Sequence, residues 1–199
     1  MIRWLKGRQF IQWLHAKETP KTPEHLDRSY LFMRKCVGYI GIALPIVLLV
    51  GTMILGNNFR IWDTISGYYY HETRNIFVGS LCAIAIFLIS YRYEHLDDIV
   101  STVAGASAIG VALFPTAPDP PLDPTAQQRM IGMVHLSFAG FFLGTLALMT
   151  ILLFRKSDKK NPKDRTSEKR LRNWVYLGCG IAILLLIVAI AVVQFLSGN

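Results

Sequence analysis

Charged side chains are absent from five long stretches of this chain. The charge-free stretches are the 24 positions between Lys35 and Arg60, 17 between Arg74 and Arg92, 20 between Asp98 and Asp119, 25 between Arg129 and Arg155, and the 27 positions after Arg172. A bilayer core of about 30 Å is crossed by about 20 apolar residues in a helix. The pattern therefore predicts five membrane-spanning helices, at about residues 36–56, 75–91, 99–115, 130–154 and 173–196.

These stretches predict an all-α polytopic integral membrane protein, a bundle of about five transmembrane helices. In hydrocarbon, backbone N–H and C=O groups have to bond within their own segment, as they do in a helix. The stretches are continuously apolar and lack the alternation of outer-membrane strands. The composition agrees, because 52% of the residues are apolar and 17% are charged, against about 45–50% and about 25% in soluble proteins. We divide the chain into a basic arm, 1–35, with a possible interfacial helix, and a transmembrane bundle, 36–199.

The basic residues predict how the bundle is oriented. The chain has 21 Lys and Arg against 13 Asp and Glu, and its net charge is +8. Eighteen of the 21 basic residues, including those of 1–35 and 155–172, fall on one side of the five predicted spans, and three fall on the other. Cytoplasmic segments of membrane proteins carry an excess of Lys and Arg. We predict a cytoplasmic N-terminus, an extracytoplasmic C-terminus and a location in the bacterial inner membrane.

Two basic segments on the predicted cytoplasmic side are candidate binding surfaces. Trp and basic residues are interleaved in the arm, as at a headgroup interface, and the 155–172 loop is suited to attract anionic lipid. No aromatic residue interleaves with the basic residues of this loop, so we expect no nucleic-acid binding. We predict contacts with anionic headgroups or with a cytoplasmic protein partner through Trp4, Arg8, Trp13, Lys159, Lys160 and Arg170.

His135 lies in the fourth predicted span. A histidine inside a membrane segment is a functional hypothesis by default, and four interpretations are open, one of which is a contact with a lipid headgroup. His71 and His135, with a carboxylate such as Asp63, have the ligand types of a zinc site. His135 and His71 with Asp119 have the groups of an acid–base site for lipid hydrolysis. Alternatively, His135 bonds to a loop carbonyl or a tyrosine hydroxyl and holds the end of the bundle together.

Other signals of catalysis or cofactor binding are missing from the sequence. The three cysteines form no C-x-x-C pair and no metal-binding spacing. The G-x-S-x-G and glycine-rich nucleotide motifs are absent, and we expect no cofactor. No span has a charged residue near its centre, which argues against an ion-coupled transporter. We interpret His95, with Asp97 and Asp98, as part of a solvated turn on the inner side.

Short motifs from the first outer loop to the fourth span carry a family resemblance. They are Ile65-Ser66-Gly67, Arg74-Asn75-Ile76-Phe77, Tyr91-Arg92, Gly105 with Gly110, Phe114-Pro115, and His135 with Ala139 and Phe141-Phe142. In these motifs the chain resembles the DRAM-like superfamily of small multi-pass membrane proteins, which includes members tied to autophagy, plasma-membrane lipid organisation and GPI-lipid maturation. It departs from the pattern because Gly67 follows Ser66 where an acidic residue is usual, and because five spans are predicted where six are typical. The resemblance implies a lipid-facing role and supplies no active site.

Three functions follow as alternatives. The first expectation is a non-enzymatic inner-membrane protein whose basic face engages anionic lipid or a soluble partner, in membrane organisation, sensing or recruitment. The second is a lipid-modifying enzyme with an extracytoplasmic His/carboxylate site. The third is an oligomeric pore or effector, because small residues four apart let helices approach closely, either within one bundle or between copies of the chain. These packing positions are Gly140, Gly144, Ala104, Ala108 and Gly110.

Overall fold

The computed structural model of the protein describes residues 24–56, 64–90, 95–118, 123–155 and 167–196. The helices are α2 (Glu24–Leu55), the 3-10 helix η1 (Ile65–Tyr70), α3 (Arg74–Ile89), α4 (His95–Leu113), α5 (Ala126–Leu148), the π-helix η2 (Met149–Leu153) and α6 (Ser167–Leu196). The described ranges contain no strand, and they confirm the predicted all-α, multi-pass membrane bundle.

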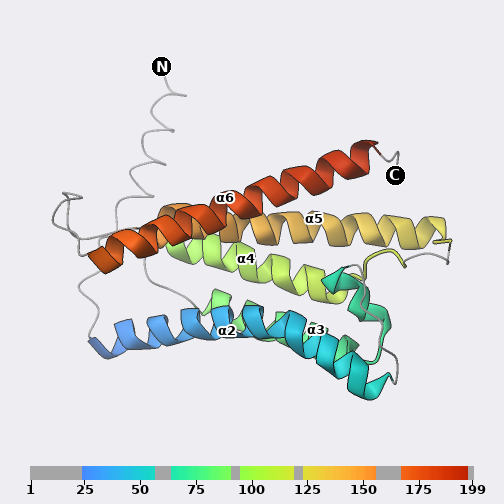
Figure 1. The fold of residues 1–199 in the computed structure, drawn as a ribbon, viewed down its shortest axis with the longest axis horizontal. Helices are drawn as coiled ribbons and strands as arrows, with labels where there is room; N and C mark the ends of the chain where they lie inside the picture. The colour runs from blue at the N-terminus through green and yellow to red at the C-terminus, as the bar shows by residue number, and fades with distance from the viewer. Residues whose placement is uncertain (1–23, 57–63, 91–94, 119–122, 156–166, 197–199) are drawn as a thin grey trace, which may run out of the picture.

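Successive long helices run in opposite directions along one bundle (Figure 1). We call one end of the bundle the η1 end, which carries η1 and the segment 114–118. The other is the η2 end, which carries η2 and the first turns of α4 and α6. Helices that are neighbours in the sequence are also neighbours in space, from α2 to α6. The C-terminus of α6 therefore lies at the η1 end, opposite the start of α2 (Figure 1).

Four of the helices contain a stretch long and apolar enough to cross a membrane. The four stretches are Leu31–Leu55, His95–Leu113, Ala126–Leu153 and Ser167–Val193. The fifth apolar helix, α3, has 16 residues, which corresponds to about 24 Å of helix axis. All five long helices begin before the predicted spans, and the difference is largest for α2, which starts at Glu24, and α6, which starts at Ser167. The first turns of α2 and α6 contain charged residues, because a helix that spans the membrane can continue past the hydrocarbon into the polar layer.

Two apolar clusters hold the helices together. Towards the η1 end, Leu48, Phe77 and Val111 join α2, α3 and α4. Towards the η2 end, Leu88 of α3 and Met149 of η2 belong to a second cluster. Many apolar side chains of α2 and α6 lie on the outside of the bundle instead, as expected for helices that face lipid rather than water.

The five predicted packing residues divide into two groups. Ala104 and Ala108 on α4 are fully buried, and a Cβ atom at Gly110 would lie 2.3 Å from the Phe138 ring of α5. By contrast, a Cβ atom at Gly140 or Gly144 would meet no described atom within 4 Å beyond the local helix backbone. The described elements therefore make no close contact at Gly140 or Gly144, and their packing, within the bundle or between copies of the chain, stays a prediction.

A buried pair of hydroxyl groups joins α2 to the start of α3. The Oγ1 atoms of Thr52 and Thr73 are 3.1 Å apart, and both side chains are buried. We expect Thr52→Val to lower the free energy of unfolding by about 1 kcal/mol, because the Thr73 hydroxyl loses its partner in an apolar site. The double variant Thr52→Val/Thr73→Val should cost less than the sum of the single ones, because neither hydroxyl remains.

Denaturant titration of the purified protein in detergent measures these differences. Thr145→Val on α5 is the control, because its hydroxyl bonds to the Phe141 carbonyl of its own helix at 2.7 Å. Strictly additive losses for Thr52 and Thr73 would contradict the pairing.

Candidate functional site

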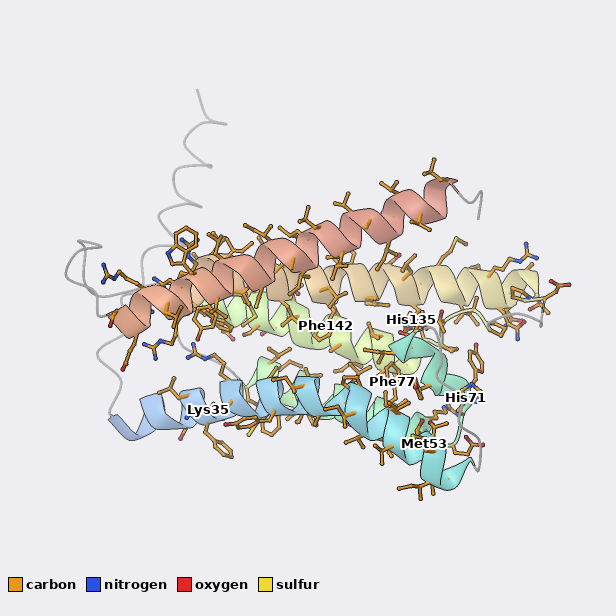
Figure 2. All side chains as sticks on the ribbon, viewed as in Figure 1. Lys35, Met53, His71, Phe77, His135 and Phe142 are labelled. Atoms are coloured by element: carbon orange, nitrogen blue, oxygen red, sulfur yellow. The ribbon has the colours of Figure 1, made fainter. Side chains whose placement is uncertain are left out.

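His135 joins three separate elements at the η1 end. Its Nδ1 atom lies 2.6 Å from the carbonyl oxygen of Phe114, immediately after α4. Its Nε2 atom lies 3.0 Å from the hydroxyl oxygen of Ser66 in η1. The side chain is 4% exposed. Figure 2 shows His135 on α5 close to η1, with His71 farther along towards the tip of the η1 end.

The chemistry of these partners assigns the protons. A carbonyl oxygen only accepts hydrogen bonds, so Nδ1 of His135 carries a proton and donates it to Phe114. In the neutral imidazole Nε2 then has a free lone pair, and the Ser66 hydroxyl donates to it. His135 thus also satisfies a carbonyl that the end of α4 leaves without a helical partner.

The local structure of η1 fixes the position of Ser66. Thr64 caps this short helix, since its hydroxyl accepts a hydrogen bond from the Gly67 amide at 3.0 Å. At its other end, the Tyr70 hydroxyl donates to the Thr116 carbonyl at 2.6 Å and ties η1 to the segment after α4. Gly67 is buried and Ser66 is half-buried. The Ser66 hydroxyl, which faces His135, is therefore held in place by hydrogen bonds of residues that precede and follow it in η1.

The packing below the site holds α4 and α5 at a close distance. Phe138 lies one turn after His135 on α5, and its ring lies against Gly110 of α4. The same ring stacks on the Phe114 ring, with centroids 5.7 Å apart. Gly132 of α5 lies equally close to the segment that follows α4, since a Cβ atom there would lie 2.9 Å from the backbone nitrogen of Ala117. A larger residue at either glycine would move α5, and with it the imidazole, away from Phe114.

The partners that a metal site or an acid–base site would require are not the observed partners of His135. Its two ring nitrogens bond to Ser66 and Phe114, so neither a carboxylate nor His71 is paired with it among the described residues. Those residues also contain no group of three His, Cys, Asp or Glu that is suited to hold a metal ion. Asp63 and Asp119, the other candidates for a metal or acid–base site, lie outside the described residues. The interpretation of His135 as bonded to a backbone carbonyl is confirmed.

Positive charge from three elements gathers around Phe154 at the η2 end. The guanidinium carbon of Arg34, on α2, lies 4.8 Å from the centroid of the Phe154 ring. Nζ of Lys169, on α6, lies 3.5 Å from the Phe154 carbonyl oxygen. Arg155 is the next residue. Its guanidinium donates to the Ile151 carbonyl at 3.5 Å, and its Nε atom is buried with no hydrogen-bond partner in the described chain. We call Arg34, Arg155 and Lys169 the Phe154 cluster.

Exposed residues at the start of α6 adjoin this cluster. Arg170 and Arg172 are exposed, and Leu171 and Trp174 expose 67% and 72% of their surface. Trp and basic residues together are typical of the boundary between hydrocarbon and headgroups. Of the other residues expected to bind lipid or a partner, Trp4, Arg8, Trp13, Lys159 and Lys160 lie outside the described residues.

The start of α4 differs from the solvated turn that the sequence predicts. Asp97 is 3% exposed, and Nε2 of His95 and Oδ1 of Asp98 are buried. The interpretation of this segment as a solvated turn is wrong, because α4 packs against α3, α5 and η2 and these polar groups are buried in the bundle. Asn173 of α6 is also buried at this end.

No family model, curated protein or solved structure compared with this chain matches it.

Proposed function

We propose that this multi-pass protein binds anionic lipid headgroups at the η2 end of its bundle, within the inner membrane of a bacterium. The observation that carries the proposal is the Phe154 cluster, in which Arg34, Arg155 and Lys169 come together from three elements. A headgroup phosphate accepts several hydrogen bonds, and arginine is well suited to bind it in a bidentate manner. Arg34 and Arg155 have guanidinium groups of this kind.

The distribution of charge between the two ends supports this site. Among residues whose side chains are described, the η2 end has six basic and three acidic residues, whereas the η1 end has two of each. Each basic residue near an anionic membrane surface contributes about 1 kcal/mol of attraction. With the orientation that the positive-inside rule predicts, the η2 end faces the cytoplasm, where the leaflet is anionic.

The exposed apolar residues beside the cluster support a headgroup as the occupant. Leu171 and Trp174 are more than half exposed beside Arg170 and Arg172. In this arrangement the apolar side chains enter the outer hydrocarbon while the cations meet phosphate. The resemblance to DRAM-like proteins also favours a lipid-facing role.

The test compares how two lipids stabilise the protein. We expect mixed micelles with phosphatidylglycerol to raise the thermal unfolding midpoint more than micelles with phosphatidylcholine, because a ligand that binds the folded state stabilises it. The triple variant Arg34→Gln/Arg155→Gln/Lys169→Gln should lose most of this difference between the lipids. Comparing the lipids within each variant removes the direct effect of the substitutions on stability.

A matched variant at the other end of the molecule is the control. Arg74→Gln/Arg129→Gln removes both described basic residues of the η1 end, and it should keep the preference for phosphatidylglycerol. Equal stabilisation by the two lipids in the unsubstituted protein, or an unchanged preference in the triple variant, would contradict headgroup binding at the Phe154 cluster.

A further inference from the structure

The Ser66–His135 pair has the arrangement of a nucleophile and its general base. The Ser66 hydroxyl lies 3.0 Å from Nε2 of His135, within the range for direct proton transfer. The opposite ring nitrogen is 2.6 Å from the Phe114 carbonyl, which fixes the tautomer that leaves Nε2 free to accept a proton. Activated serines in enzymes share this set of a hydroxyl, a base and a third group that orients the base.

We propose that Ser66 is an acyl-accepting nucleophile and that the substrate is the carboxylic ester of an acyl lipid. In the first step, Oγ of Ser66 attacks the ester carbonyl carbon while its proton passes to Nε2 of His135. The carbon–oxygen bond to the alcohol breaks, the alcohol oxygen takes the proton from His135, and the acyl group stays on Ser66. Water then attacks the acyl-serine and gives its proton to His135, which returns it to Ser66 as the carboxylic acid leaves.

The surroundings of the pair favour a lipid ester over a water-soluble one. Ser66 is half-buried rather than enclosed. Around it at the η1 end, large apolar side chains are exposed on three elements, namely Ile65, Tyr70, Leu113, Phe114, Met130 and Met133. The pair lies at the level where α4 ends, close to the depth at which the ester groups of a bilayer meet its hydrocarbon. This activity is separate from headgroup binding at the η2 end, and either proposal stands if the other fails.

Covalent labelling of the purified full-length protein in detergent tests the nucleophile. A fluorophosphonate reacts with an activated serine by losing fluoride, and we expect its phosphonyl group on the peptide that contains Ser66. Ser66→Ala should abolish this adduct, and His135→Gln should slow its formation by about 100-fold or more, because a general base contributes about 10²–10⁴. Ser137→Ala is the control, since this exposed serine bonds only to the Met133 carbonyl of its own helix.

Incubation with 4-nitrophenyl octanoate tests the ester class. We expect release of nitrophenol and an octanoyl group on Ser66, both of which require Ser66 and His135. Absence of either adduct from Ser66 in the folded protein would overturn the proposal and leave the pair as a purely structural contact.

A third measurement does not depend on the stability of the His135 variant. In Ser66→Cys, the introduced thiol keeps its position beside the imidazole, and a thiol paired with an imidazole forms the reactive thiolate more readily. Iodoacetamide should therefore alkylate it faster than it alkylates the thiol introduced by Asp123→Cys, an exposed position outside the apolar helices at the same end of the bundle. Alkylation at Ser66→Cys no faster than at Asp123→Cys would also overturn the proposal.

Discussion

Gly110→Leu should lower the free energy of unfolding by about 3 kcal/mol, at the upper end of what overpacking costs. Even the first added atom, Cβ, would lie 2.3 Å from Cγ of Phe138. The ring has little room to move, because it is stacked on Phe114 with centroids 5.7 Å apart. The remaining way to fit the side chain is to separate α4 from α5. Denaturant titration in detergent measures the loss.

The same substitution at Gly140 is the matched control. No described atom lies within 4 Å of a Cβ at Gly140 beyond the local helix backbone, so Gly140→Leu should be neutral or stabilising by up to about 1 kcal/mol, because leucine favours a helix more than glycine does. Shortening the aromatic residue in Gly110→Leu/Phe138→Ala should recover part of the loss. Equal effects of leucine at the two glycines would contradict the close contact between α4 and α5.

His135→Ala should release η1 from the bundle and lower the free energy of unfolding by about 3 kcal/mol. The substitution leaves the Phe114 carbonyl and the Ser66 hydroxyl without their partner, and each unsatisfied buried group costs about 1–3 kcal/mol. Partial access of water at the half-buried Ser66 moderates the sum. Because η1 is a single short helix, it should loosen well before the long helices separate.

Hydrogen exchange of backbone amides distinguishes this local release from general destabilisation. In His135→Ala, the amides of Gly67 and His71 should exchange faster, because they bond within η1 to Thr64 and Tyr68. Amides in the middle of α4 should change less. Unchanged protection in η1, or an equal effect of Ser137→Ala, would show that His135 does not hold this helix in place.

The positions of the helices could be predicted because a charge in hydrocarbon is costly. The stretch without charges after Arg172 and the one before Arg155 each correspond to a long observed helix. The helix starts were predicted less well, since charge marks where the hydrocarbon ends and not where the backbone leaves the helix. Arg34 and Lys35 therefore lie inside α2 and not in an arm before it.

The sequence identified His135 but not its partner. A histidine in an apolar span is a clear signal, and a bond to a backbone carbonyl was one expected outcome. Ser66 is 69 residues away, and it reaches His135 only because η1 folds back along the end of the bundle. The hydrogen bond from Tyr70 to Thr116 helps to set that path. No periodic pattern of apolar residues encodes such a contact, and in the sequence Ser66 stands out only as part of a motif that carries a family resemblance.

Small residues four apart proved ambiguous for a related reason. Ala104 and Ala108 are fully buried, whereas a Cβ atom at Gly140 or Gly144 would meet no described atom within 4 Å beyond the local helix backbone. A spacing of four places two residues on one face of a helix but does not say what that face meets. The burial of Asp97 was equally hidden, because it depends on how α4 packs against its neighbouring helices.

The short helix α3 has a consequence for the shape of the surrounding bilayer. Its 16 residues are about 6 Å too short for a hydrocarbon layer of about 30 Å. At one end of α3, η1 packs on the helix and makes up part of the missing length with protein. A backbone that is not α-helical is tolerated at this depth when it is covered by protein. Ile86 of α3 nevertheless exposes 63% of its surface on the outside of the bundle. We therefore expect the hydrophobic belt of this protein to be lower on the α3 side, where lipids would have to shorten or tilt, and we expect thinner membranes to be favoured.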